Sequence, residues 1–124
     1  DSADVVASYT YLDKSEDYRI DEVDASFYAL NYPPHRATLG LVWFATDTVE
    51  VRIDNEWRKQ ETNALRNGGD SAFFSHVTFT YSPAQVEGLS LVLAVDNLWD
   101  ERFEEIPGTP GRGDQYSATV TYFW

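Results

Sequence analysis

The sequence predicts an all-β fold, a six-stranded antiparallel meander made of three hairpins. Apolar and polar side chains alternate in six segments, and no helical period of comparable strength appears. These segments are rich in Tyr, Phe, Trp, Thr and Val, which favour strands, and aromatic residues make up 15% of the 124 residues. Short connections between the segments also alternate with long ones.

The first three strands are predicted over residues 5–12, 38–45 and 49–57. Successive strand side chains point to opposite faces, so each strand has one apolar face. On the first three strands that face carries Val5, Ala7, Tyr9 and Tyr11, then Leu39, Leu41 and Trp43, then Val49, Val51, Ile53 and Trp57.

The last three strands are predicted over residues 73–81, 89–97 and 116–124. Their apolar faces carry Phe73, Val77, Phe79 and Tyr81, then Leu89, Leu91, Leu93 and Val95, then Tyr116, Ala118, Val120, Tyr122 and Trp124. No charged residue falls on the apolar face of any of the six strands. The opposite faces are mostly polar, with the exceptions Val6, Leu12, Val42, Phe44, Phe74, Val92, Ala94 and Phe123.

The connections predict a membrane barrel. Residues 46–48 and 82–88 form short connections, whereas residues 13–37, 58–72 and 98–115 form long ones. Short periplasmic turns and long extracellular loops are typical of outer-membrane barrels. If the last strand ends in the periplasm, the first, third and fifth strands run outward.

The aromatic residues also indicate that the apolar face contacts lipid. They fall at two levels with aliphatic residues between them, as expected at the two membrane interfaces. The outer level holds Tyr9, Tyr11, Trp57, Phe73 and Tyr116, and the inner level holds Trp43, Phe79, Tyr81, Tyr122 and Trp124. Because membrane barrels have about 8 strands or more, we expect further strands, from sequence outside this chain or from other copies.

The overall charge excludes one class of partner. Lys and Arg total 9 and Asp and Glu total 21, so the net charge is −12, which argues against nucleic-acid binding. The chain starts at Asp1 with no Met or signal peptide, so we expect a processed product or a fragment. There is no cysteine, His35 and His76 have no partner motif, and the acidic segment that follows Asp13 lacks the spacing of an EF-hand. We therefore predict no catalytic, cofactor or metal site and no enzyme activity.

The most specific motif lies near the C-terminus. The run Asn97, Leu98, Trp99, Asp100, Glu101, Arg102 and Phe103 resembles the pattern Asn-Leu-Phe-Asp-x-x-Tyr of TonB-dependent receptors. Trp99 replaces the usual Phe and Phe103 the usual Tyr, and both changes keep an aromatic ring. The run Pro110, Gly111 and Arg112 resembles part of the last extracellular loop of that family.

The last strand resembles the signal that the barrel-assembly machinery recognises, in which apolar residues alternate up to a terminal aromatic ring. The matching positions are Tyr116, Ala118, Val120, Tyr122 and Trp124, with Trp124 where Phe is usual. A terminal strand of this kind can add to another sheet by β-augmentation.

The resemblance implies that residues 1–124 are the C-terminal part of a receptor barrel of roughly 22 strands, without its plug and earlier strands. Such receptors sit in the outer membrane of Gram-negative bacteria and take up scarce nutrients such as iron-siderophores. The implied partners are outer-membrane lipid, the rest of the barrel and plug, the barrel-assembly machinery, and TonB through an N-terminal segment not in this chain. Two alternatives remain open: a small oligomeric outer-membrane pore and a soluble β-barrel-like ligand-binding protein.

Overall fold

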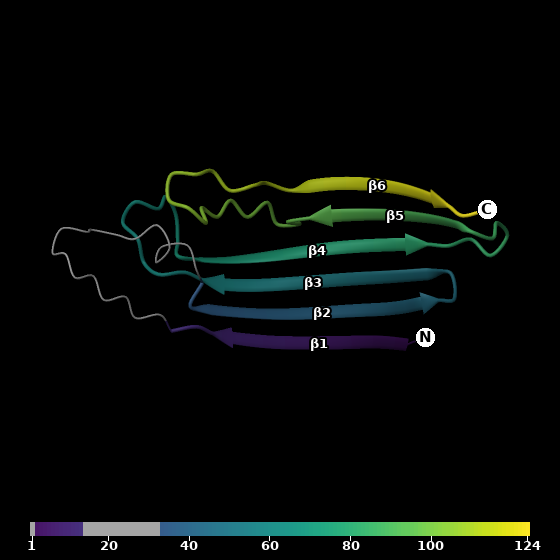
Figure 1. Ribbon diagram of the computed structural model, residues 1–124, viewed down its shortest axis with the longest axis horizontal. Helices are drawn as coiled ribbons and strands as arrows, with labels where there is room; N and C mark the ends of the chain where they lie inside the picture. The colour runs from purple at the N-terminus through teal and green to yellow at the C-terminus, as the bar shows by residue number, and fades with distance from the viewer. Residues whose placement is uncertain (1, 14–32) are drawn as a thin grey trace.

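A computed structural model describes residues 2–13 and 33–124. The strands of these residues form one antiparallel sheet. Strands adjacent in sequence are adjacent in the sheet, in the order β1 to β6 (Figure 1). This confirms the predicted all-β, six-stranded meander. The strands are β1 (Ser2–Tyr11), β2 (His35–Thr46), β3 (Val49–Lys59), β4 (Ser71–Tyr81), β5 (Leu89–Asp96) and β6 (Gln115–Tyr122).

Several strand ends differ from the prediction. β1 and β2 begin three residues earlier than expected, and β3 continues to Lys59. β5 stops at Asp96 because Asn97 adopts a positive φ of 53°, which turns the chain out of the strand. Leu12 follows β1, yet its amide still donates to the Pro34 carbonyl at 2.9 Å, which extends the pairing with β2 by one bond.

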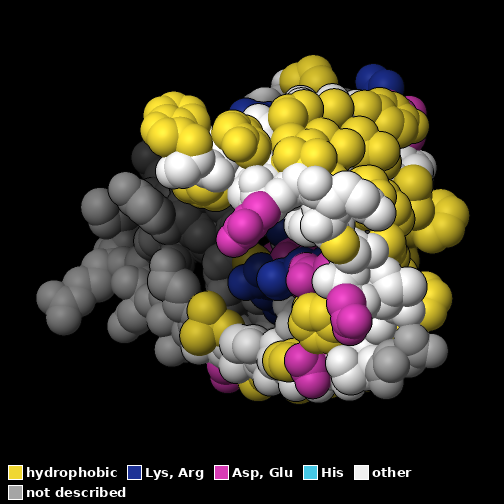
Figure 2. Space-filling model, turned by 90° about the vertical axis from the view of Figure 1, so that its right-hand side faces the viewer, with side chains coloured by type: hydrophobic (Ala, Val, Ile, Leu, Met, Phe, Trp, Pro, Cys, Tyr) yellow, Lys and Arg dark blue, Asp and Glu magenta, His cyan; other side chains and the backbone are white. Residues whose placement is uncertain are grey.

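The register keeps the apolar residues on one face of all six strands. One continuous row across the sheet consists of Val5, Leu41, Ile53, Val77, Val95 and Tyr116. A shift of one residue in any pair would move a charged residue such as Arg52 onto this face, so the alternating pattern fixes the register. The sheet is curved. Seen along the strands, hydrophobic side chains cover its outside, and charged side chains lie in the hollow (Figure 2).

The two ends of the sheet differ in the length of their connections. Residues 47–48 and 82–88 make the short connections at one end, and the long loops gather at the other (Figure 1). In the second short connection Gly88 has a φ of 82°, and a Cβ there would lie 2.1 Å from the Phe123 carbonyl oxygen. Only glycine fits this position, where its carbonyl accepts the Phe123 amide at 3.0 Å.

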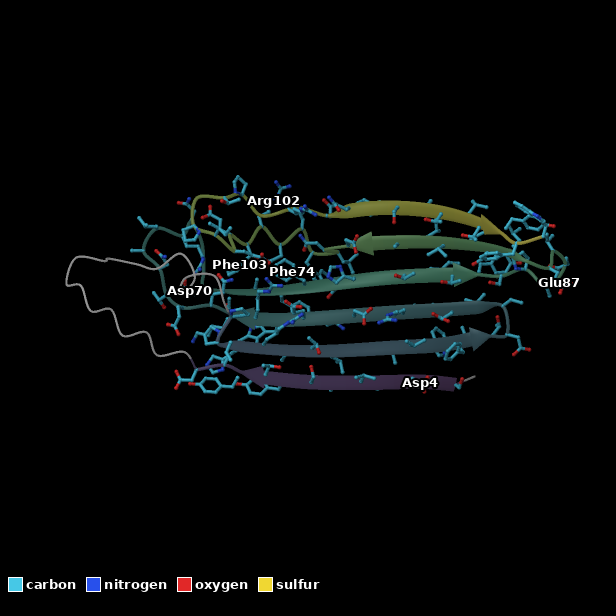
Figure 3. The ribbon with its side chains drawn as sticks, viewed as in Figure 1. Asp4, Asp70, Phe74, Glu87, Arg102 and Phe103 are labelled. Carbon is cyan, nitrogen blue, oxygen red and sulfur yellow. The ribbon has the colours of Figure 1, made fainter. Side chains whose placement is uncertain are left out.

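The interior of the described chain lies beneath the long loops and not on the sheet. Among residues 2–13 and 33–124, the buried hydrophobic side chains are Ala72 and Phe103 only. Figure 3 shows Phe103 beside Phe74 at the loop end, with Asp4 and Glu87 at the opposite end. The part of the chain that the structure describes contains no helix long and apolar enough to cross a membrane.

Candidate functional site

The outward face of the sheet exposes large hydrophobic side chains over its whole width. Val5 is 64% exposed, Leu93 55% and Val120 69%. Val5 and Val120 lie on the edge strands β1 and β6, and Leu93 lies on β5. We call the apolar side of β1 to β6 the outward apolar face.

The register shows how the aromatic residues are arranged on this face. Near the loop end, Tyr9, Trp57 and Phe73 lie in one row across β1, β3 and β4. Near the turn end, Trp43 and Phe79 share another row. On β6, Tyr116 pairs with Val95 and so lies four residue pairs closer to the turn end than the Phe73 row. Tyr122 is displaced from the Phe79 row in the same direction and by the same number of pairs, so both aromatic bands are level up to β4 and are shifted toward the turn end on β6.

The spacing between the two bands is the same on β4 and β6. Phe73 and Phe79 are six positions apart on β4, and so are Tyr116 and Tyr122 on β6. On β4 the outermost ring, Tyr81, extends the spacing to eight positions, or about 26 Å along the strand at roughly 3.3 Å per residue. In a strand tilted by about 40° this length would rise about 20 Å across a membrane, which is somewhat less than the apolar band of about 25 Å on membrane barrels.

The opposite face lines the hollow with paired charges. Glu56 on β3 accepts from Arg36 on β2 at 2.6 Å and also pairs with Arg58. Arg58 pairs in addition with Glu105 of the loop after β5, and its guanidinium lies over the Phe74 ring. Toward the turn end, Arg52 pairs with Asp54 at 2.7 Å. The polar side chains of β3 therefore face the hollow, and ion pairs connect Arg52 with Asp54 and Glu56 with Arg36 and Arg58.

A cavity of about 550 Å³ opens between this polar face and the loop after β5. Its walls include Glu56, Arg58, Phe74 and Phe103, together with Pro110, Gly111 and Arg112. His76 and Asp96 meet at its floor, with Nδ1 and Oδ1 3.1 Å apart. The mixture of both charges with two aromatic rings suits a polar organic molecule, held by hydrogen bonds and by ring contacts.

Asn97, the first residue of the predicted motif, organises the loop that covers this cavity. Its side chain is buried, donates to the carbonyls of Glu101 and Arg112 at 3.0 and 2.9 Å, and accepts the Glu101 amide at 3.0 Å. The Leu98 amide donates to the Ser75 carbonyl at 2.9 Å, which continues the pairing with β4 after β5 has ended. The motif therefore folds the loop after β5 back on itself.

Trp99 brings the same loop onto the outward apolar face. Its indole N–H donates to the Ser75 hydroxyl at 2.7 Å, and that hydroxyl donates to the Asn55 side chain at 2.6 Å. Ser75 and Asn55 are polar residues on the otherwise apolar face, and this hydrogen-bond chain satisfies them. Ser75 is only 2% exposed as a result.

The remaining motif residues hold the loop together. Arg102 is paired with Asp100, and this pairing, together with the Asp114 amide, lowers the pKa of Asp100. The Phe103 side chain is buried, and Gly111 packs so closely on the Phe103 backbone that a Cβ there would lie 2.4 Å from its carbonyl oxygen. The predicted motif positions thus come together in space, in one structural unit.

A second cluster of side chains, which no pattern in the sequence predicts, joins the two long loops through Arg66. The Arg66 side chain is fully buried. It donates to Gln60 Oε1 at 2.7 Å and Asp70 Oδ1 at 2.6 Å within its own loop, and to the Glu104 carbonyl of the other loop at 3.0 Å. Its guanidinium also lies over the Phe103 ring, 5.4 Å from the centroid. No short-range pattern marks this residue, because Glu104 is 38 positions away.

Glu104 strengthens the same connection between the loops. It accepts the amides of Gly108 and Asn67 at 2.9 and 3.1 Å, and these two bonds lower its pKa. The pKa of Asp70 is also lowered: desolvation raises it, but hydrogen bonds from Thr62 and Arg66 outweigh that effect. We call Gln60, Arg66, Asp70, Phe103 and Glu104 the loop clasp.

The predicted assembly residues share the outward apolar face of β6. Tyr116 is 72% exposed, and the Trp124 side chain is fully exposed. β6 pairs only with β5, so its other edge carries no strand among the described residues. An exposed edge of this kind can pair with a further strand.

Within the described ranges, no three His, Cys, Asp or Glu side chains come together as a metal site. Comparison with family models, with curated proteins and with solved structures found no match for the chain.

Proposed function

We propose that this chain is part of a transmembrane β-barrel of the outer membrane of a Gram-negative bacterium. The observation that carries the proposal is the placement of hydrophobic side chains: they cover the outside of a curved sheet, while ion pairs and polar groups fill its hollow. A soluble fold would bury the outward apolar face, yet the buried hydrophobic side chains of residues 2–13 and 33–124 are Ala72 and Phe103.

The two aromatic bands support the same proposal. They flank a band of aliphatic side chains, as rings do at the two interfaces of a membrane barrel. Lipid contact would stabilise the apolar residues between the bands, such as Val77 and Leu93. Among the described residues, β1 and β6 each have one edge without a partner strand, and this implies additional strands, since backbone groups cannot stay unpaired in lipid.

We further propose that the barrel is a TonB-dependent receptor that takes up a scarce nutrient such as an iron-siderophore. This step rests on the resemblance of residues 97–103, 110–112 and 116–124 to the C-terminal end of that family. In such a receptor the long loops would face outside and border the ligand entrance, and the cavity beside His76 and Asp96 would lie at that entrance. The polar hollow would face the plug.

The size of the native protein tests the receptor proposal. An antibody against residues 112–124 is used to blot outer membranes of the source cell. A band several times heavier than 14.1 kDa supports the receptor. A band at 14.1 kDa in the outer membrane would reject the receptor and favour a pore, in which β1 of one copy pairs with β6 of the next. A band found only in soluble fractions would reject the membrane proposal as a whole.

A further inference from the structure

Two basic side chains lie among aromatic rings at the loop end of the outward apolar face. His35 on β2 is directly opposite Lys59 on β3, and Tyr11 on β1 is opposite His35. The adjacent row on the same face consists of Tyr9, Ala37, Trp57 and Phe73. Directly opposite residues in a sheet have Cβ atoms about 5 Å apart, so the two basic groups can reach one ligand.

The imidazole of His35 is held in place by the two tyrosines. The Tyr9 hydroxyl lies 2.7 Å from His35 Nδ1, and the Tyr11 ring is stacked at a tilt, 5.0 Å away between centroids. When Nδ1 accepts a hydrogen bond from the Tyr9 hydroxyl, the proton of the neutral ring is on Nε2, which is then a donor toward a ligand.

Lys59 differs from the neighbouring cations in having no ion pair within residues 2–13 and 33–124. Arg58, the preceding residue, and Arg36, the residue after His35, both point into the hollow and pair with Glu56. No strand position on the outward apolar face is an Asp or a Glu. Asp13 and Glu61, which follow Tyr11 and Lys59 by two positions, lie beyond the strand ends.

We propose that His35 and Lys59 bind the phosphate of a lipid headgroup at the loop-end aromatic band. This inference rests on the proposed function, which places that band at the membrane–water interface. There a lysine extends toward the headgroups while its stem covers apolar surface, and both groups donate hydrogen bonds suited to a phosphate oxygen. The acyl chains of the same lipid lie on the outward apolar face, beside Trp57 and Leu39. The patch has two basic side chains and no carboxylate at a strand position on the same face, so it is complementary to an anionic lipid.

Lipid-dependent quenching of Trp57 fluorescence tests the proposal. The 124-residue chain, with Trp43, Trp99 and Trp124 replaced by Phe, is reconstituted in phosphatidylcholine vesicles that contain a minor fraction of phosphatidic acid. Bromine is placed on the acyl chains of one lipid or of the other. We expect phosphatidic acid to be enriched near Trp57 by about fivefold, the effect of one basic side chain near an anionic lipid surface. Lys59→Gln should remove most of this enrichment, and His35→Gln should reduce it.

Arg52→Gln is the matched control, because it removes one cation from the hollow and should leave the enrichment unchanged. Quenching by each lipid in proportion to its mole fraction in the parent chain, or unchanged enrichment in Lys59→Gln, would overturn the inference. Loss of the enrichment on adding inorganic phosphate would assign the site to the free anion, against the lipid. In the unsubstituted chain, spin-labelled phosphatidic acid should associate more strongly than spin-labelled phosphatidylcholine, and equal association would also overturn it.

A chain that does not insert gives a different result. If brominated phosphatidylcholine alone does not quench Trp57, copies of the chain do not insert with β1 of one copy paired to β6 of the next; the headgroup site is then rejected, and the membrane proposal is decided by the outer-membrane blot of the native protein. If brominated phosphatidylcholine quenches Trp57 but phosphatidic acid is not enriched, only the headgroup site is rejected.

Discussion

Arg66→Met is expected to open the connection between the two long loops without unfolding the sheet. The substitution keeps an unbranched side chain over the Phe103 ring but removes every donor of the buried guanidinium. It leaves Asp70, Gln60 and the carbonyls of Glu61 and Glu104 without these bonds.

The free-energy cost of Arg66→Met follows from the burial of the two ion-pair partners, Arg66 and Asp70. Removing one partner of a buried ion pair costs about 3–5 kcal/mol, because the other charge is left uncompensated. The Arg66 side chain is 0% exposed, but that of Asp70 is 27% exposed, so water can rehydrate the carboxylate in the variant. We therefore expect the lower end of the range, about 3 kcal/mol, which corresponds to roughly 100-fold in an equilibrium constant.

Amide hydrogen exchange of the chain in detergent micelles measures this opening. The Gln60 amide donates to the Asp70 carbonyl at 2.7 Å, and the Asn67 amide to Glu104 at 3.1 Å, so both report on the loop clasp. Both should exchange roughly 100-fold faster in Arg66→Met. Arg102→Met is the matched control: it breaks an ion pair that is exposed to solvent, and it should leave both amides unchanged. Unchanged protection of Gln60 and Asn67 in Arg66→Met would refute the reasoning.

Three further predictions follow from single features of the loops and turns. Asn97→Ala should lower the free energy of unfolding in urea by about 3 kcal/mol, because it loses three hydrogen bonds and places an alanine at a positive φ. Asn97→Gly loses the same bonds but tolerates the positive φ, so it should cost about 1 kcal/mol less. Equal losses in the two variants would contradict the role of φ. Gly88→Ala should speed exchange of the Phe123 amide far more than Gly108→Ala speeds exchange of the Thr109 amide, since a Cβ clashes with Phe123 only at the first site; similar effects would exclude the clash. The pKa of Glu104 is lowered in the folded chain, so the ionised Glu104 carboxylate stabilises the folded loops fully above its unfolded pKa of 4.5, and this stabilisation is lost as the pH falls further. Cleavage of the loops by pepsin should therefore rise below that pH, and it should rise less steeply in Glu104→Gln.

The strands, and the face of the sheet to which each of their side chains points, could be predicted from the sequence because both depend on a local property. In each strand, apolar residues recur at every second position, and a register slip would place charges such as Arg52 or Glu56 on the apolar side. The ends of the strands were less predictable. The end of β5 depends on the positive φ of Asn97, which is stabilised by the carbonyls of Glu101 and Arg112 in the loop that follows.

The loop clasp could not be predicted because its contacts join distant segments. Arg66 and Glu104 lie in different loops, and a lone arginine between Leu65 and Asn67 has no local pattern that distinguishes it from a solvated one. The same is true of Trp99, whose hydrogen bond to Ser75 bridges 24 positions. The sequence motif indicated that residues 97–103 act together, but it did not indicate which groups they contact.

The displacement of the aromatic bands on β6 is a further feature that only the register shows. Its place within its own strand predicts that Tyr116 lies at the same level as Phe73. In the sheet it lies in the row of Val77 and Val95, four residue pairs nearer the turn end. Tyr122 is displaced from the Phe79 row by the same number of pairs, so the spacing of the two bands is kept.

The most direct test of the central claim, that the outward apolar face contacts lipid, uses single-cysteine spin labels. The chain has no cysteine, so each new one is labelled specifically. Labels at Leu93→Cys and Val120→Cys report on the outward apolar face, and labels at Thr78→Cys and Thr119→Cys on the opposite face, all in a vesicle-reconstituted chain. The account predicts that the first pair is accessible to oxygen dissolved in the lipid and protected from a water-soluble nickel chelate, and that the second pair shows the reverse. Outward labels that are shielded from both reagents would mean that the face is a protein core, and would contradict the account.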